Sequence, residues 1–203
     1  MLKQEEVLQI EQAVQSAEAK TSSEIAVCML RASGEDRGIA ALVGLVVLAV
    51  VGGLGEFLWP ETNTYLLFAA ALAVGIGAFF LADLFDLGLN LLPAYLVAED
   101  ARRTARAMFL DRALDATPER NAVLLFVSRA ERYVEILPDR GLAAQVPVQR
   151  WTDMVTSFQA TAREKGMVEA AVATIARIGE TCAHPFPANG MNPDPISNKP
   201  VTK

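Results

Sequence analysis

Two long apolar segments, separated by a short polar turn, constrain the fold of this chain more than any other feature. The first covers about 22 residues, 38–59, and contains a single acid, Glu56, near its end. After the turn at residues 60–64, a second segment begins at Tyr65 and stays apolar to Ala82. An α-helix rises about 1.5 Å per residue, so about 20 residues cross the hydrocarbon core of a bilayer. Backbone groups in lipid must be satisfied within the segment, so both are predicted to be transmembrane helices, at about 38–59 and 65–86.

The distribution of basic residues predicts how this hairpin is oriented. All 18 Lys and Arg residues lie outside the interval from Gly38 to Ala101. Arg31 and Arg37 precede the first helix, and a cluster of arginines at 102, 103 and 106 follows the second. Because cytoplasmic flanks of membrane helices are enriched in Lys and Arg, both termini are predicted to be cytoplasmic and the turn external.

Small residues and two acids within the hairpin leave alternatives open. The glycines and alanines of both helices favour close helix packing, either within the hairpin or against another membrane subunit. Asp83 and Asp86 follow the second apolar segment, at the expected cytoplasmic interface. They are interpreted either as carboxylates solvated among the lipid headgroups or as a proton or partner site.

The rest of the chain has the pattern of a small α/β domain. Two continuous apolar runs, residues 25–30 and 122–127, are typical of strands buried on both faces. Residues 132–137 alternate and predict a third strand, paired with the second as a β-hairpin. Helical periodicity is found at residues 3–20, at 94–114, around Trp151 and from Val168 onward. The long crossover between the first two strands predicts that they are parallel, and the third is predicted to be antiparallel to the second.

The predicted fold class is therefore α/β, a small mixed sheet of three to four strands flanked by helices. The transmembrane hairpin is inserted after the first strand. Residues 1–37 hold the first helix and strand, 38–92 the hairpin and 93–184 the rest of the domain. Residues 185–203 are rich in proline and are predicted to be an irregular tail.

Charge and cysteine content narrow the function classes. The net charge is −6 and no basic stripe with interleaved aromatics is present, which argues against nucleic acid as a partner. Cys28 and Cys182 both lie in apolar stretches and are predicted to be buried free thiols. His184 is the single histidine and lies just before Pro185, without a partner at a catalytic spacing.

Several motifs, taken in order, resemble the TPM-domain family, in its prokaryotic branch with an inserted transmembrane hairpin. They are the helix-to-strand junction at 17–25, the stretch RNAVLLFVSRAERYVEILPDRG at 120–141, Trp151, and the proline-containing stretches 184–187 and 192–195. Two positions depart from the family pattern. Ser23 replaces the usual glycine before Glu24, and Asp83 and Asp86 stand where a basic cluster is expected.

The resemblance implies an accessory or repair factor of membrane complexes in the bacterial cytoplasmic membrane, where the chain would be a multi-pass protein. It also implies, from plant members, phosphatase activity and calcium binding. No G-x-S-x-G elbow, P-loop or metalloprotease signature occurs in the sequence. Asp139, at the end of the third strand, is the candidate catalytic residue. It could hold a metal or attack a phosphate, or it could simply cap the next helix.

The hypotheses for binding residues follow from the same motifs. Asp139, Glu135 and Glu24 are the candidate ligands for a divalent cation such as calcium, although no cofactor is expected. Asp83, Asp86, Arg140 and Trp151 are the candidate residues for binding a partner. The predicted function is a membrane-anchored interaction module that docks on an integral-membrane protein complex, with the lipid bilayer as a second partner. The alternative is a metal-assisted phosphohydrolase at the cytoplasmic face of the membrane, so an enzyme is the less favoured interpretation.

Overall fold

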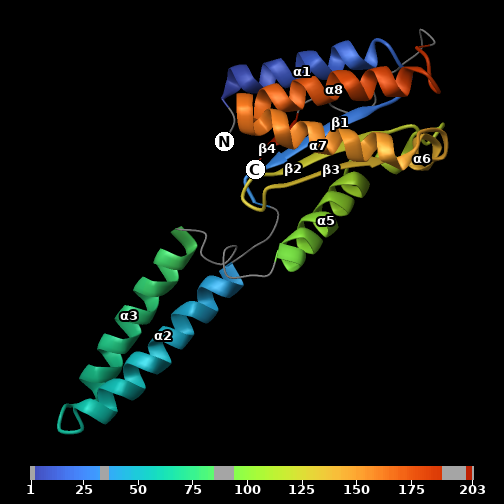
Figure 1. The fold of residues 1–203 in the computed structure, drawn as a ribbon. Helices are drawn as coiled ribbons and strands as arrows, with labels where there is room; N and C mark the ends of the chain where they lie inside the picture. Colours follow the sequence, from blue (N-terminus) through green and yellow to red (C-terminus); the bar gives the residue numbers. More distant parts are fainter. Residues whose placement is uncertain (1–2, 33–36, 85–93, 189–199, 203) are drawn as a thin grey trace. The chain divides into compact units, whose positions relative to one another are not determined.

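The computed structural model describes residues 3–32, 37–84, 94–188 and 200–202 (Figure 1). The chain divides into two compact units. The first, Met1–Ser33 with Glu99–Lys203, is an α/β unit, and the second, Gly34–Ala98, contains the helical hairpin.

The α/β unit is built on a four-stranded sheet with the order β3-β2-β1-β4. Strands β1 (Ile25–Leu30) and β2 (Val123–Ser128) run parallel, with Ile25 opposite Val123. Strand β3 (Tyr133–Pro138) is antiparallel to β2, and β4 (Val201–Thr202) is parallel to β1. The predicted parallel pair and the antiparallel third strand are therefore confirmed.

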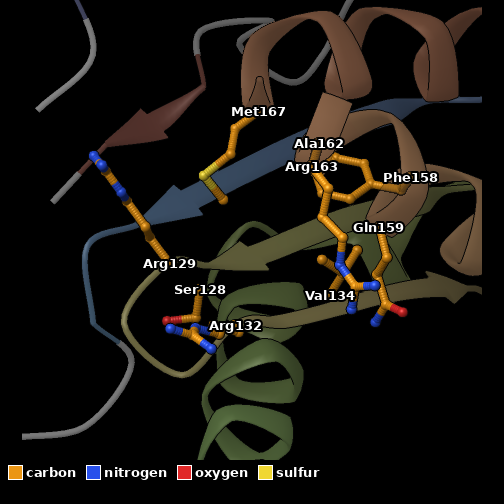
Figure 2. A pocket seen from close by; sticks show the side chains of 9 residues that line it. All are labelled: Ser128, Arg129, Arg132, Val134, Phe158, Gln159, Ala162, Arg163 and Met167. Carbon is orange, nitrogen blue, oxygen red and sulfur yellow. The ribbon is translucent and has the colours of Figure 1, made fainter. Parts of the chain in front are cut away.

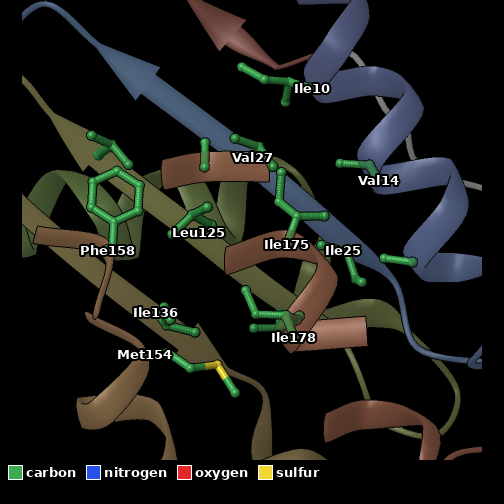
Figure 3. Packing of buried hydrophobic residues seen from close by; sticks show 14 of the residues in the cluster. Ile10, Val14, Ile25, Val27, Leu125, Ile136, Met154, Phe158, Ile175 and Ile178 are labelled. Atoms are coloured by element: carbon green, nitrogen blue, oxygen red, sulfur yellow. The ribbon is translucent and has the colours of Figure 1, made fainter. Parts of the chain in front are cut away.

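Helices cover both faces of this sheet, which explains why β1 and β2 are buried at every position (Figure 1). Helices α1 (Gln4–Glu18), α7 (Val148–Lys165) and α8 (Met167–Ala183) cover one face, and α5 (Ala94–Asp111) covers the other. A short helix, α6 (Arg140–Gln145), follows β3, and a 3-10 turn, η1 (Leu114–Ala116), follows α5. Figure 3 shows Ile10 and Val14 of α1 packed with Ile175 of α8 over β1 and β2.

The alternation in β3 places its side chains as the sequence predicts. Val134 and Ile136 join the core beneath α1, α7 and α8, whereas Tyr133 packs with the cluster beneath α5. Cys28 and Cys182 are buried free thiols, as predicted. Burial raises the pKa of Cys182 to about 12, an effect that the neighbouring Ser23 hydroxyl partly offsets. The thiol therefore stays protonated at neutral pH.

The second unit consists of α2 (Arg37–Leu58) and α3 (Thr64–Leu84), the two apolar helices predicted after the first strand. They pack through small residues. A Cβ on Gly44 would lie 2.9 Å from the carbonyl oxygen of Gly75, and the reverse substitution meets the carbonyl of Gly44 at the same distance. These glycines thus serve packing within the hairpin, while Gly53 and Gly77 have nothing within 4 Å.

The predicted irregular tail differs from the structure at two places. Pro187 forms an antiparallel bridge with Thr21, and the carbonyl of Phe186 accepts hydrogen bonds from the amide of Ser22 and the hydroxyl of Thr21. Val201 and Thr202 form β4 beside β1. Both segments pair their backbones with the sheet or its entry loop, which composition alone does not reveal; residues 189–199 of the predicted tail lie outside the described part.

Candidate functional site

Asp139 lies at the junction between β3 and α6, where the sequence predicts a ligand or a helix cap. The residue caps α6, and its Oδ1 accepts a hydrogen bond of 2.7 Å from the amide of Arg140. Its Oδ2 lies 3.0 Å from Nε of Arg120 in an ion pair. The side chain of Asp139 is only 4% exposed. Oδ1 is therefore held by a hydrogen bond, whereas Oδ2 has the ion pair with Arg120 but no hydrogen-bond partner among the described residues.

Arg120 is placed for this contact by an unusual backbone. Its φ of 53° lies in the left-handed region, which non-glycine residues adopt only at some energetic cost. The guanidinium also donates to the carbonyl oxygen of Asp115, and the carbonyl of Arg120 accepts from the amide of Gly141 at 2.8 Å. Arg120 thus ties the loop before β2 to the start of α6.

Gly141 completes this junction through close backbone contact. A Cβ at this position would lie 2.4 Å from the carbonyl oxygen of Glu119 and 2.7 Å from that of Arg120. No side chain fits there, so glycine is required by space. The Asp-Arg-Gly motif at 139–141 is accordingly explained as a structural latch between the loop before β2 and α6.

The other two candidate metal ligands belong to different surroundings. Glu24 is 3% exposed, directly before β1, and its carbonyl accepts from the amide of Val123 at 2.8 Å. Glu135 lies in the middle of β3, where its carboxylate accepts from the hydroxyl of Tyr133 at 2.9 Å and pairs with Arg102 at 3.8 Å. Among the residues that the structure describes, no three His, Cys, Asp or Glu side chains gather as a metal site would require.

Glu135 is part of a polar cluster on the α5 side of the sheet. Burial, together with the hydrogen bond and the negative charge of Glu135, raises the pKa of Tyr133 well above its ordinary value. Arg102 and Arg106 lower it. The phenol therefore stays protonated and donates a hydrogen bond to Glu135 within β3, while the ion pair between Arg102 and Glu135 links β3 to α5.

The four candidate residues for partner binding differ in their exposure to solvent. Asp83 is exposed near the end of α3, and Arg140 is exposed in the first turn of α6. Asp86 lies outside the described residues. Trp151 is only 5% exposed and belongs to the core, with its indole Nε1 lacking a hydrogen-bond partner within the described part. Its place on the buried face of α7 explains the tryptophan by packing.

A pocket of about 440 Å³ beside the β2–β3 turn was not predicted from the sequence. Figure 2 shows it between that turn, α7 and the start of α8. Three of its lining residues are arginines. The full lining is Ser128, Arg129, Arg132, Val134, Phe158, Gln159, Ala162, Arg163 and Met167. The sequence gives only a weak signal for this pocket, because arginines in a tight turn are usually solvated and Arg163 is about 30 residues away from the turn in the sequence.

The latch at Asp139 leads to a test by substitution. We expect Asp139→Ala to lower the free energy of unfolding by about 2 kcal/mol, because it removes a helix cap and an ion pair. Asp139→Asn keeps the cap and is expected to cost about 1 kcal/mol, since Arg120 is partly solvated. Chemical denaturation of the full chain in detergent measures both changes. A double-mutant cycle with Arg120→Asn, which tolerates the left-handed backbone, should show coupling between the two sites.

The catalytic interpretation of Asp139 predicts a different outcome. As a nucleophile or metal ligand, Asp139→Asn would abolish divalent-dependent turnover of a phosphate ester by a purified wild-type protein. Robust turnover that disappears in this variant, with stability unchanged, would contradict the structural latch.

Comparison with known proteins identifies the domain. Residues 94–181 match the family model of the TPM domain. Among solved structures, the NMR structure of the BA42 protein from the psychrophilic bacterium Bizionia argentinensis is similar, with a TM-score of 0.61 and 17% identity. That match covers 100% of this chain and 96% of the other, and at this identity it supports the fold alone. No curated protein matches the chain. The motifs of the sequence and the family match agree that residues 94–181 resemble a TPM domain, and the α/β fold is the one that this similarity implies.

Proposed function

We propose that this chain is a membrane-anchored interaction module, which holds its α/β unit at the membrane and docks it on a larger integral-membrane protein complex. The observation that carries the anchoring is the exposure of the hairpin. Helix stretches Ala40–Leu58 and Thr64–Leu84 are long and apolar enough to cross a membrane, yet only 11% and 17% of them are buried. The core helix of a soluble protein of this length would be mostly buried instead.

The exposed side chains of the hairpin are large as well as apolar. Phe57 is 82% exposed, and Phe68 and Phe80 are each more than 60% exposed. Apolar patches of this extent on a soluble protein lead to aggregation, whereas lipid tails solvate them. Trp59 and Tyr65 flank the turn, where amphipathic rings favour the interface between lipid and water.

Two features of the α/β unit, the engaged carboxylate of Asp139 and an arginine-lined pocket, support the interaction role. The buried acid that follows β3, Asp139, is engaged by Arg120 and by the amide of Arg140. The metal-assisted phosphohydrolase needs a carboxylate free to bind an ion or attack a phosphate, so this alternative has less support. An open pocket with an arginine rim is instead the kind of feature that binds a partner.

The proposed topology is tested by introduced cysteines. We expect Asn63→Cys, in the turn between α2 and α3, to react with a membrane-impermeant maleimide in intact cells. Lys165→Cys, at the end of α7, should react only after the cells are broken, because the positive flanks are retained in the cytoplasm. Cys28 and Cys182 are buried and should give little background. Labelling of residue 165 in intact cells, with residue 63 protected, would reverse the orientation.

Docking is tested separately by isolating the full chain in mild detergent and identifying the associated proteins by mass spectrometry. The proposal expects one integral-membrane protein at constant stoichiometry. A chain that is extracted from membranes by carbonate, without detergent, would contradict the anchoring itself.

A further inference from the structure

The pocket beside the β2–β3 turn concentrates positive charge on a chain whose net charge is −6. Arg129 and Arg132 come from the turn, and Arg163 comes from the last turn of α7. All three side chains are exposed, and none forms an ion pair with an acid in the described ranges. Glu131, the acid of this turn, accepts a hydrogen bond from the hydroxyl of Ser128. The guanidinium groups are therefore available to a ligand.

The floor of the pocket has the opposite character. Val134 of β3, Phe158 and Ala162 of α7, and Met167 at the start of α8 contribute its apolar surface. Figure 2 shows Gln159 and Arg163 one helical turn apart on α7, beside Val134. Apolar floors bordered by arginine are typical of protein interfaces, and the flexible methionine thioether adapts to different side chains.

The backbone of the turn also favours the arginine at position 132. Its φ of 52° lies in the left-handed region, where glycine or asparagine would be more stable than arginine. Strained backbone positions gather at functional sites, so the conformation of Arg132 agrees with the binding role argued from the lining of the pocket.

We propose that this pocket binds an acidic peptide segment of a protein partner, in which carboxylates flank an apolar side chain. The carboxylates would pair with Arg132 and Arg163, because guanidinium groups bind carboxylates through two parallel hydrogen bonds. The apolar side chain would cover Val134, Phe158 and Met167. A lipid headgroup is a poorer match, because it is polar and would leave this apolar floor uncovered.

This inference deepens the proposed function by naming the chemistry of the partner, and it rests on the interaction role rather than on membrane insertion. Failure of the peptide test would leave the topology result untouched. The carboxylates could come from acidic side chains or from a C-terminus. Peptides with free and with amidated C-termini distinguish these sources.

The test measures binding of labelled peptides to the full chain in detergent by fluorescence anisotropy. The probes are a synthetic peptide with a central Glu-Leu-Glu-Phe-Glu, its counterpart with Lys in place of Glu, and a third with Ser in place of Leu and Phe. We expect the acidic peptide to bind and both counterparts to bind at least tenfold more weakly. Arg163→Gln and Arg132→Asn should each weaken binding about tenfold, as expected when one member of a charged hydrogen-bonded pair is lost.

Arg150→Gln is the matched control, since Arg150 is exposed on the same helix as Arg163 but does not line the pocket. It should bind the acidic peptide like the wild type. The unfolding midpoint of each variant checks that its fold is intact. Arg129→Gln changes the third arginine of the pocket and is measured in the same binding assay. Equal binding of acidic and basic peptides, or losses no larger than that of Arg150→Gln, would overturn the proposal. The proposal would also be overturned if the protein bound none of the peptides but bound vesicles containing phosphatidylglycerol more tightly than vesicles of phosphatidylcholine.

Discussion

Val123→Asp is expected to unfold the α/β unit. Val123 is fully buried in β2, between Ile25 of β1 and Pro138 of β3. A carboxylate at this position would have no partner and no water, which costs several kcal/mol. Small domains have a total free energy of unfolding of only about 5–15 kcal/mol, so most of the stability would be lost. Circular dichroism and urea denaturation of the full chain in detergent measure this.

The matched control introduces the same carboxylate at a valine outside the core. Val148, at the start of α7, is 78% exposed, so Val148→Asp should change the unfolding midpoint little. An acid near a helix N-terminus is even slightly favourable. If the Val123→Asp and Val148→Asp proteins have the same urea midpoint of unfolding, β2 is not the central strand that the structure describes.

Gly141→Ala should also destabilise strongly, although it adds only one methyl group. That methyl would lie 2.4 Å from the carbonyl oxygen of Glu119, so the backbone of α6 or of the loop before β2 must move. The movement would disturb the contact between Arg120 and Asp139 as well. We expect a loss of about 3 kcal/mol in the free energy of unfolding, at the upper end for overpacking.

The identical change elsewhere in the chain serves as its control. Gly77 in α3 has nothing within 4 Å of an added Cβ, so Gly77→Ala should leave the unfolding of the α/β unit unchanged. A Gly141→Ala protein as stable as the wild type would mean that the loop and α6 separate easily. The latch would then be no explanation for the Asp-Arg-Gly motif.

The fold could be predicted because its signals are periodic and long. The continuous apolar runs of β1 and β2 indicate strands covered on both faces, and helices do cover both faces. The alternation in β3 places Val134 and Tyr133 on opposite sides, as observed. The predicted sheet of three to four strands allows for β4 but does not place it, because two residues carry no period and its pairing with Cys28 and Met29 depends on tertiary contacts.

The site was harder to predict, since it depends on which side chains meet in space. The sequence drew attention to Asp139, and the structure explains that residue by a cap and by Arg120, whose left-handed backbone has no clear signal in the sequence. Glu24 and Glu135 were grouped as metal ligands by residue type alone. The arginine pocket joins the turn at 129–132 to Arg163, a pairing that only the packing of α7 on β3 creates.

The insertion of the hairpin between two paired strands affects how the chain is made. During synthesis, Ile25 of β1 cannot pair until Val123 of β2 has been made, about 100 residues later in the chain. At synthesis rates of about 5–20 residues per second, that delay is about 5–20 seconds. During this time the apolar strand 25–30 has no partner, and unpaired strands of this kind aggregate. Cells that make this protein should therefore depend on a factor that shields the nascent N-terminal strand, and moving the hairpin to follow β2 should reduce that dependence by shortening the delay by about half.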